Sequence, residues 1–176
     1  IVDGNEGAPY KRNLGAKSSK ESNKYLFFCD DDCFLPKDHI RILYENITSS
    51  NNEQVAYVYT DYNGIVNNKS GYMKNFKHTA KSWNWNSLLM ANYISTMSLI
   101  DKQHFIGFDE NLSRFQDWEL WINTYISKKK IGMYVKETMF DAYYNDEGIT
   151  SAKVDPNKAI RYIQKKHSIS LGKKRR

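Results

Sequence analysis

The chain contains 176 residues, of which 40% are hydrophobic and 14% aromatic, and its formal net charge is +6. This length and composition favour one folded domain with a substantial core and exclude a disordered protein. No apolar run is long enough to span a membrane, and the first residues are not expected to form a signal peptide.

The positive charge is concentrated at the end of the chain. Residues 173–176, Lys-Lys-Arg-Arg, carry four of the six net charges. A terminal run of this kind is usually a solvated tail, although it could also make peripheral contact with an anionic membrane. We expect no nucleic-acid partner.

Two cysteines, Cys29 and Cys33, flank an acidic triplet. Their spacing does not match a zinc site and the sequence offers no second pair, which favours reduced thiols. We therefore expect a cytoplasmic protein, located at the inner face of a bacterial membrane if the basic tail makes contact there.

The first predicted helix begins near Pro9, because proline suits the first turn of a helix, and continues through Leu14 and Ala16. Arg12 and Asn13 lie near its start, where a cation and an amide could meet phosphate or ribose oxygens. For an Arg-Asn pair considered alone, a surface role is the more common outcome.

An unbroken apolar run at residues 25–29 predicts a strand buried on both faces, and it ends in Asp30, Asp31 and Asp32. Three carboxylates cannot share a core without partners, so we expect them at the exposed carboxyl edge of the sheet. Alternate side chains of an extended segment point the same way, so Asp30 and Asp32 can converge on Mg²⁺ or Mn²⁺ that also holds a phosphate. A solvated acidic turn leading into a helix is an equally open alternative.

The next residues predict a helix at 37–48, a strand at 55–59 and a hairpin or mobile excursion across 63–82. Trp83 and Trp85 follow and alternate with asparagine. These two indoles could form a sugar-stacking surface or anchor their loop to the core.

Residues 94–100 predict a further strand, and Asp101 is expected to cap a short helix that runs through Phe105. Another helix begins at Phe115 and places Asp117 in its first turn. From the residues alone, Asp117 could interact with the helix dipole or act as a general base in aromatic surroundings, and the first role is favoured.

The last predicted elements are a strand at 131–140, a polar loop at 141–151 and a helix from Pro156 with Ala159 and Ile163 facing inward. The sequence has no Gly-rich phosphate loop of the Walker type, no Ser nucleophile elbow and no paired His-Glu zinc motif.

Several landmarks occur in a fixed order along the chain. They are Asn5-x-Gly7, Arg12-Asn13-x-Gly15, Asp30-Asp31-Asp32 followed by Pro36, the strand ending at Asp61, Ser98-Leu-Ile-Asp-Lys, Gly107-Phe-Asp-Glu, and Gln116-Asp117-Trp118-Glu119-Leu120. Together they resemble the second half of a family 2 glycosyltransferase domain. The resemblance implies an α/β, GT-A-type fold with a mixed sheet flanked by helices, without the N-terminal strands that bind the nucleotide. It divides the chain into a partial GT-A domain at 1–151 and a C-terminal helix and basic tail at 152–176.

The resemblance also implies a set of site residues. They are the metal ligands Asp30 and Asp32, the donor-binding residues Arg12, Asn13 and Asp31, the catalytic base Asp117, and the acceptor-binding residues Trp118 and Glu119. The implied cofactor is Mn²⁺ or Mg²⁺. Some family members supply a further metal ligand, a His, from the loop after the last strand; this chain has no His there, and Asp146 is the candidate.

The implied activity is metal-dependent, inverting transfer of a sugar from a nucleoside diphosphate sugar, with a UDP-linked donor favoured, to a glycan or lipid-linked acceptor. Two alternatives stay open. A metal-dependent nucleotidyltransferase would also use carboxylates at a sheet edge, although its Gly-rich signature loop is missing. A non-catalytic binding module would act through the basic tail.

Overall fold

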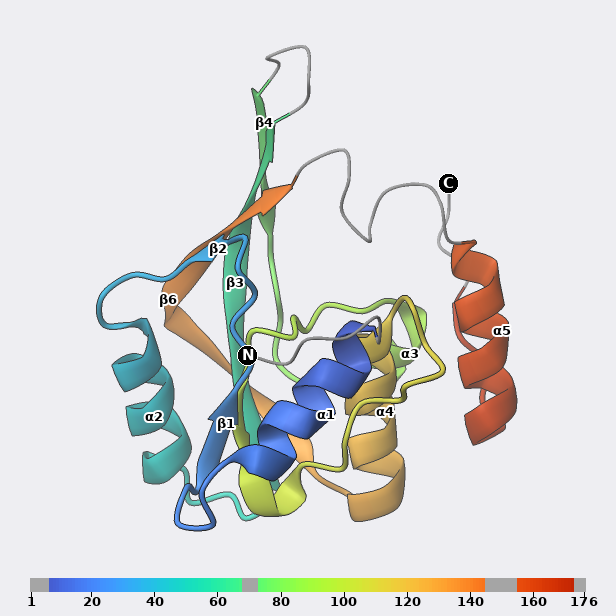
Figure 1. Cartoon of the computed structure of the whole chain (residues 1–176), viewed down its shortest axis with the longest axis horizontal. Helices are drawn as coiled ribbons and strands as arrows, with labels where there is room; N and C mark the ends of the chain where they lie inside the picture. The colour runs from blue at the N-terminus through green and yellow to red at the C-terminus, as the bar shows by residue number, and fades with distance from the viewer. Residues whose placement is uncertain (1–6, 68–72, 145–154, 173–176) are drawn as a thin grey trace.

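The computed structural model describes residues 7–67, 73–144 and 155–172. Within these residues, six strands form one mixed sheet that is flanked by helices (Figure 1). The helices are α1 (Ala8–Ser18), α2 (His39–Ser49), α3 (Trp85–Met90), the 3-10 helix η1 (Lys102–His104), α4 (Gln116–Lys128) and α5 (Pro156–His167). The strands are β1 (Tyr25–Phe27), β2 (Cys33–Phe34), β3 (Val55–Asn67), β4 (Met73–His78), β5 (Leu99–Asp101) and β6 (Ile131–Tyr144).

The sheet is built around two long parallel strands, β3 and β6. The other pairings are antiparallel, and the strand order is β1-β5-β3-β6-β2. Along one edge of β3, β5 pairs with its first half and β4 with its second half. The β3–β4 hairpin therefore extends beyond the body of the sheet (Figure 1).

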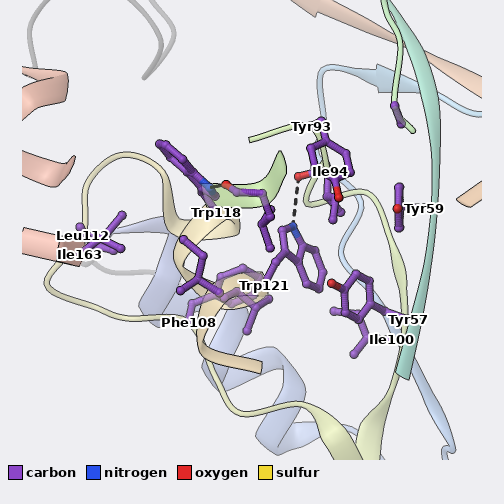
Figure 2. Close-up of a cluster of buried hydrophobic side chains, with 14 of the residues drawn as sticks. Tyr57, Tyr59, Tyr93, Ile94, Ile100, Phe108, Leu112, Trp118, Trp121 and Ile163 are labelled. Carbon is purple, nitrogen blue, oxygen red and sulfur yellow. Dashed lines mark hydrogen bonds between the residues drawn. The ribbon is translucent and has the colours of Figure 1, made fainter. Parts of the chain in front are cut away.

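Residues of β3 alternate between two cores, as a strand covered on both faces requires. Val58 packs in the cluster under α2, whereas Tyr57 stacks on Trp121 of α4 with ring centroids 4.2 Å apart. Figure 2 shows Trp121 among the buried side chains, with its Nε1 donating a hydrogen bond of 3.1 Å to the carbonyl of Ile94. These contacts fix α4, which carries Asp117, against the sheet.

Most predicted elements are present in the structure. The helices predicted from Pro9, at 37–48, from Phe115 and from Pro156 correspond to α1, α2, α4 and α5, and the strands predicted at 25–29, 55–59 and 131–140 to β1, β3 and β6. The segment at 63–82 contains the hairpin strand β4. Asp101 caps η1 as expected, because its side chain accepts a hydrogen bond from the backbone N–H of Gln103.

The strand predicted at 94–100 is shorter than expected, since β5 begins only at Leu99. In the preceding residues, side chains accept hydrogen bonds from backbone N–H groups. Asn92 Oδ1 accepts from the N–H of Ile94, and Ser95 Oγ accepts from the N–H of Met97. Local bonds of this kind offer the backbone an alternative to strand pairing.

Two other boundaries also differ from the prediction. The strand predicted at 25–29 ends at Phe27, and the short strand β2, which has no clear sequence signal, follows the acidic triplet and pairs with β6. The first residues of the predicted loop at 141–151 belong to β6, which continues through Tyr144. A two-residue strand is too short to show a periodic pattern, so pairing with β6 defines it.

The indoles of Trp83 and Trp85 both pack on Tyr125 of α4, each with a centroid distance of 4.8 Å. Both side chains are partly buried against the main core. This arrangement favours the anchoring role over a sugar-stacking surface.

Helix α5 packs into the same core as α4. Ala159 and Ile163 are buried there beside Trp118 and Leu120, as the apolar face of the predicted helix indicated. None of the helices in the described residues combines the length and apolarity needed to cross a membrane.

Candidate active site

The acidic triplet lies in the loop between β1 and β2, and backbone contacts hold both of its ends. The N–H of Asp30 donates to Sδ of Met97 at 3.3 Å, and the carbonyl of Asp32 accepts from the N–H of Tyr143 in β6 at 2.8 Å. We call residues 30–32 the aspartate loop. All three of its residues line an open cleft.

Cys33 follows the aspartate loop and lines the same cleft. Burial, together with the nearby charge of Asp32, raises the pKa of the Cys33 thiol to about 12. A raised pKa favours the protonated thiol, which is a poor nucleophile. Cys29 and Cys33 are both free.

The guanidinium of Arg12 joins three elements. Nη2 donates to Oδ1 of Asp30 at 2.5 Å, and Nη1 donates to Oε1 of Gln116 at 3.0 Å. The guanidinium carbon also lies 5.5 Å from the centre of the Phe108 ring. One cation thus holds α1, the aspartate loop and the start of α4 together at the cleft.

Asp117 is the second residue of α4, and it faces the cleft. Its Oδ1 accepts from the N–H of Trp118 and its Oδ2 from Nδ2 of Asn92, both at 2.8 Å. Burial raises the pKa of Asp117, against the lowering effects of these two bonds and of the Arg12 charge. A carboxylate with a raised pKa is a stronger base than a solvated one, which suits general-base chemistry.

The backbone turns sharply just before Asp117. Phe115 precedes α4 with a φ of 61°, in the left-handed region that non-glycine residues rarely adopt. Such conformations are held in place by the surrounding structure and gather at functional sites. Phe115 itself lines the cleft.

Asn92 is a site residue for which the sequence carries no signal. It lies in the irregular segment before β5, 25 residues from Asp117 along the chain. Its Oδ1 accepts from the N–H of Ile94, so its amide is held at both ends and Nδ2 is directed at Asp117. Asn92 therefore fixes the orientation of the Asp117 carboxylate.

The cleft has a volume of about 1150 Å³. It brings together most of the residues predicted for the site, namely Arg12, Asp30, Asp31, Asp32, Asp117 and Trp118. Asn13 and Glu119 do not contribute to the lining formed by the described residues.

Asn13 contacts a neighbouring loop instead of the cleft. Its Nδ2 donates to the carbonyl of Phe108 at 2.9 Å and to Oε1 of Glu110 at 2.8 Å, and its Oδ1 accepts from the N–H of Phe108 at 2.7 Å. Gly107 precedes this contact with a φ of 85°, which glycine adopts without strain. The geometry gives Asn13 the role of a loop anchor, and its donor contact stays a prediction.

Trp118 and Glu119 differ in their relation to the cleft. Trp118 lines the cleft although it is only 4% exposed, and its Nε1 donates to the carbonyl of Leu88 at 2.6 Å. Glu119 is fully buried and its Oε1 accepts from Lys166 and His167 of α5. Residues two apart on a helix point about 200° apart, so Asp117 and Glu119 face opposite sides of α4. The structure therefore does not bring Glu119 to the predicted acceptor position.

Aromatic side chains from three adjacent strands form one wall of the cleft. His78 of β4 stacks on Tyr62 of β3 with centroids 4.5 Å apart, and Tyr62 stacks on Phe140 of β6 at 5.2 Å. Tyr144 donates a hydrogen bond of 3.2 Å to the Tyr62 hydroxyl and lies 5.7 Å from the Phe76 ring. We call these five residues the aromatic wall. The spacings Phe76-x-His78 and Phe140-x-Ala-x-Tyr144 place the side chains on one face of the sheet.

Asp30 and Asp32 both line the cleft, and their role as metal ligands stays a prediction. Within the ranges that the structure describes, no group of three or more His, Cys, Asp or Glu side chains could hold a metal. Mg²⁺ is commonly bound through one or two carboxylates together with waters and substrate phosphates, and the aspartate loop matches that pattern. Asp146, the candidate third ligand, lies outside the described residues.

A glycosyltransferase-like family 2 model matches residues 6–143, which is most of the chain. The comparison with curated proteins gives no match. The matched range contains Arg12, the aspartate loop and the start of α4 with Asp117, and the mixed sheet flanked by helices is consistent with a GT-A-like fold. The chain therefore belongs to glycosyltransferase-like family 2.

Proposed function

We propose that the chain transfers a sugar from a UDP-linked donor to a glycan or lipid-linked acceptor, with inversion at the anomeric carbon. Family membership supports glycosyl transfer in general. The observation that carries the specific proposal is the cleft whose lining combines Arg12, the aspartate loop and Asp117. It offers a cation for a diphosphate, carboxylates for a metal and a base for a hydroxyl.

Asp117 is the base in this proposal. The proton of the acceptor hydroxyl passes to Asp117 as the hydroxyl oxygen forms a bond to the anomeric carbon. The bond from that carbon to the diphosphate oxygen breaks on the opposite face, and its electron pair leaves with the nucleoside diphosphate. A single displacement of this kind inverts the anomeric configuration. The raised pKa of Asp117 provides the basicity, and Asn92 provides the orientation.

Arg12 and the aspartate loop hold the donor in this proposal. The planar guanidinium of Arg12 can donate two parallel hydrogen bonds to phosphate oxygens. Asp31, which also lines the cleft, is a further donor contact. Asp30 and Asp32 are the residues that would hold Mn²⁺ or Mg²⁺, and such a cation supplies Lewis-acid neutralisation of the charge on a leaving diphosphate.

We also propose that the chain acts in the cytoplasm, at the inner face of a bacterial membrane where lipid-linked acceptors are found. The support is the charge of residues 173–176, which could contact anionic lipids. These residues lie outside the described ranges.

Product analysis tests this function. The purified chain is incubated with Mn²⁺, a UDP-sugar (UDP-glucose, UDP-galactose or UDP-N-acetylglucosamine) and a mixture of methyl β-glycosides as acceptors. Release of UDP with a new glycosidic bond of inverted configuration is the expected result. Release of sugar 1-phosphate from the UDP-sugar would indicate nucleotidyl transfer instead, and retention of configuration would contradict the single displacement.

Two variants separate the cleft from the rest of the surface. Asp117→Asn removes the proposed base and should abolish transfer. Glu137→Gln changes an exposed carboxylate on β6 outside the cleft lining and should leave transfer unchanged. Equal activity in both variants would contradict the assignment of Asp117.

A further inference from the structure

The aromatic wall has no part in the proton transfer or the donor contacts proposed above, yet it occupies a large part of the cleft. Its members come from three adjacent strands, with His78 and Phe76 on β4, Tyr62 on β3, and Phe140 and Tyr144 on β6. Phe140 is buried behind Tyr62, whereas the other four rings are partly or largely exposed. Since β4 and β6 flank β3, His78 and Phe140 cover the two faces of the Tyr62 ring, and the ring surface open to a ligand belongs mainly to Phe76 and His78.

The β3 backbone allows this surface to be continuous. A Cβ atom at Gly64 would lie 2.1 Å from Cζ of Phe76, so the Phe76 ring lies directly over Gly64. Gly64 pairs with Phe76 on one side and with Ala142 on the other. The absence of a side chain at Gly64 thus leaves room for the Phe76 ring on this face.

The wall combines aromatic rings with two hydroxyl groups. The hydroxyls of Tyr62 and Tyr144 lie 3.2 Å apart. A pyranose ring has the complementary shape, because its C–H face packs on an aromatic ring while its equatorial hydroxyls reach polar groups at the ring's edge. The wall therefore matches a sugar ring in both shape and polarity.

The hydroxyl pair, the aspartate loop and Asp117 line the same cleft. Burial raises the pKa of Tyr62, and the Asp117 charge adds to this effect. Burial and the hydrogen bond to Tyr62 raise the pKa of Tyr144, with a further contribution from the Asp32 charge. A sugar ring packed on Phe76 or His78 would lie in the same cleft as Asp117, the group proposed to remove a proton from the acceptor.

We propose that the aromatic wall is the subsite that binds a pyranose ring of the acceptor. The acceptor is then a glycan or glycoside that offers a sugar hydroxyl to Asp117. This inference rests on the proposed function, because it uses Asp117 as the base. The competing occupant is the uracil of the donor, which would also stack on the wall.

Saturation-transfer NMR on the full chain tests the proposal with four small probes. Three are methyl glycosides, of β-glucose, β-galactose and N-acetyl-β-glucosamine, and the fourth is uridine. We expect the ring protons of at least one glycoside to receive saturation from the wild-type chain. The effect should weaken roughly fivefold in Phe76→Ala and in His78→Ala, in line with the loss of one ring contact.

Tyr143→Ala is the matched control. Tyr143 is 48% exposed and neighbours Tyr144 on β6, but it points to the other face of the sheet and does not line the cleft. The backbone N–H that holds Asp32 is retained in this variant. Tyr143→Ala should leave glycoside saturation unchanged, and thermal melts of all variants should show that each one folds.

The outcomes separate the subsite from the function. No saturation of any glycoside, or equal saturation in Phe76→Ala and Tyr143→Ala, overturns the acceptor subsite. Saturation of uridine that depends on Phe76 and His78 in place of the glycosides overturns it in favour of a nucleotide site. Wall-dependent glycoside binding without any UDP release from UDP-sugars would keep the binding site but contradict the transfer reaction.

Discussion

Nε2 of His167 and Oε1 of Glu119 lie 2.8 Å apart, and Nζ of Lys166 lies 2.8 Å from the same oxygen. Lys166 also contacts Oδ2 of Asp109 at 2.6 Å. The fully buried carboxylate of Glu119 therefore joins α5 to α4. Through Asp109, Lys166 also joins α5 to the loop at 107–110, which Asn13 of α1 contacts at Phe108. A residue of the predicted acceptor site is instead part of the connection between two helices.

Replacing Glu119 with alanine should destabilise the fold. The change removes a fully buried charge and leaves the positive charge of Lys166 with Asp109 as its remaining carboxylate partner among the contacts described. Breaking a buried ion pair from one side costs about 3 kcal/mol. Urea unfolding measures the loss, with the exposed Glu137→Ala as the control, expected within about 0.5 kcal/mol of wild type. Equal effects of the two changes would contradict the role of Glu119.

Asp117→Asn should abolish activity with little change in stability. Loss of a general base reduces the rate by roughly a hundred- to ten-thousand-fold. The neutral amide removes the cost of burying a charge, but it has one acceptor oxygen for the two bonds from Trp118 and Asn92, so these effects oppose each other and the free energy of unfolding at neutral pH should change by less than about 1 kcal/mol. A transfer assay and a thermal melt on the same sample check both parts. A variant that loses activity because it melts at a lower temperature would contradict this explanation.

Asn92→Ala should shift the pH dependence of transfer. The hydrogen bond from Asn92 lowers the pKa of Asp117, so its removal raises that pKa further. The acid limb of kcat against pH should then move up by about one pH unit, because a hydrogen bond to a charged group contributes roughly 1.5 kcal/mol.

Asn46→Ala is the control for this shift, because Asn46 bonds within α2 to the carbonyl of Ile42 and does not line the cleft. Its pH profile should match that of the wild type. An Asn92→Ala profile with an unchanged midpoint and a lower plateau would show that Asn92 does not act on the Asp117 pKa.

His39 should make the stability depend on pH. It is fully buried, its Nδ1 lies 2.9 Å from Oγ1 of Thr138, and its Nε2 has no hydrogen-bond partner in the described part of the chain. Burial lowers the pKa of His39 from 6.5 to about 4. As the pH falls through this interval, the unfolded chain takes up a proton that the folded chain does not, so stability falls by up to about 3 kcal/mol.

His39→Leu removes this proton uptake. Urea unfolding at pH about 7.5 and about 5 should show a smaller difference for the variant than for the wild type. The same difference in both proteins would assign the pH dependence to other groups.

The sequence predicted best those features that depend on residues close together in the chain. The apolar run before Asp30 and the helical spacing after Phe115 were enough to predict a strand, a helix and the carboxylates at their ends. The contacts of Asn92 and Glu119 could not be predicted in the same way, because their partners lie 25 and 47 residues away and are chosen by packing.

The same limit applies to the sheet. Strand β2 exists because Cys33 and Phe34 pair with β6, and β6 continues through Tyr144 because β3 continues beside it. The aromatic wall requires three strands in register before its rings meet. Its alternating spacing was present in the sequence, but the neighbouring strands were needed to interpret it.

The most direct test of the donor site is UDP binding with and without Mn²⁺, measured by isothermal titration calorimetry on the wild-type chain and on the Asp30→Asn, Asp32→Asn double variant. Mn²⁺ should strengthen UDP binding by the wild type and have no effect on the variant, because the aspartate loop supplies the protein's ligands to the metal. UDP binding that responds equally to Mn²⁺ in both proteins, or no UDP binding by either, would contradict a metal-assisted donor site at the aspartate loop.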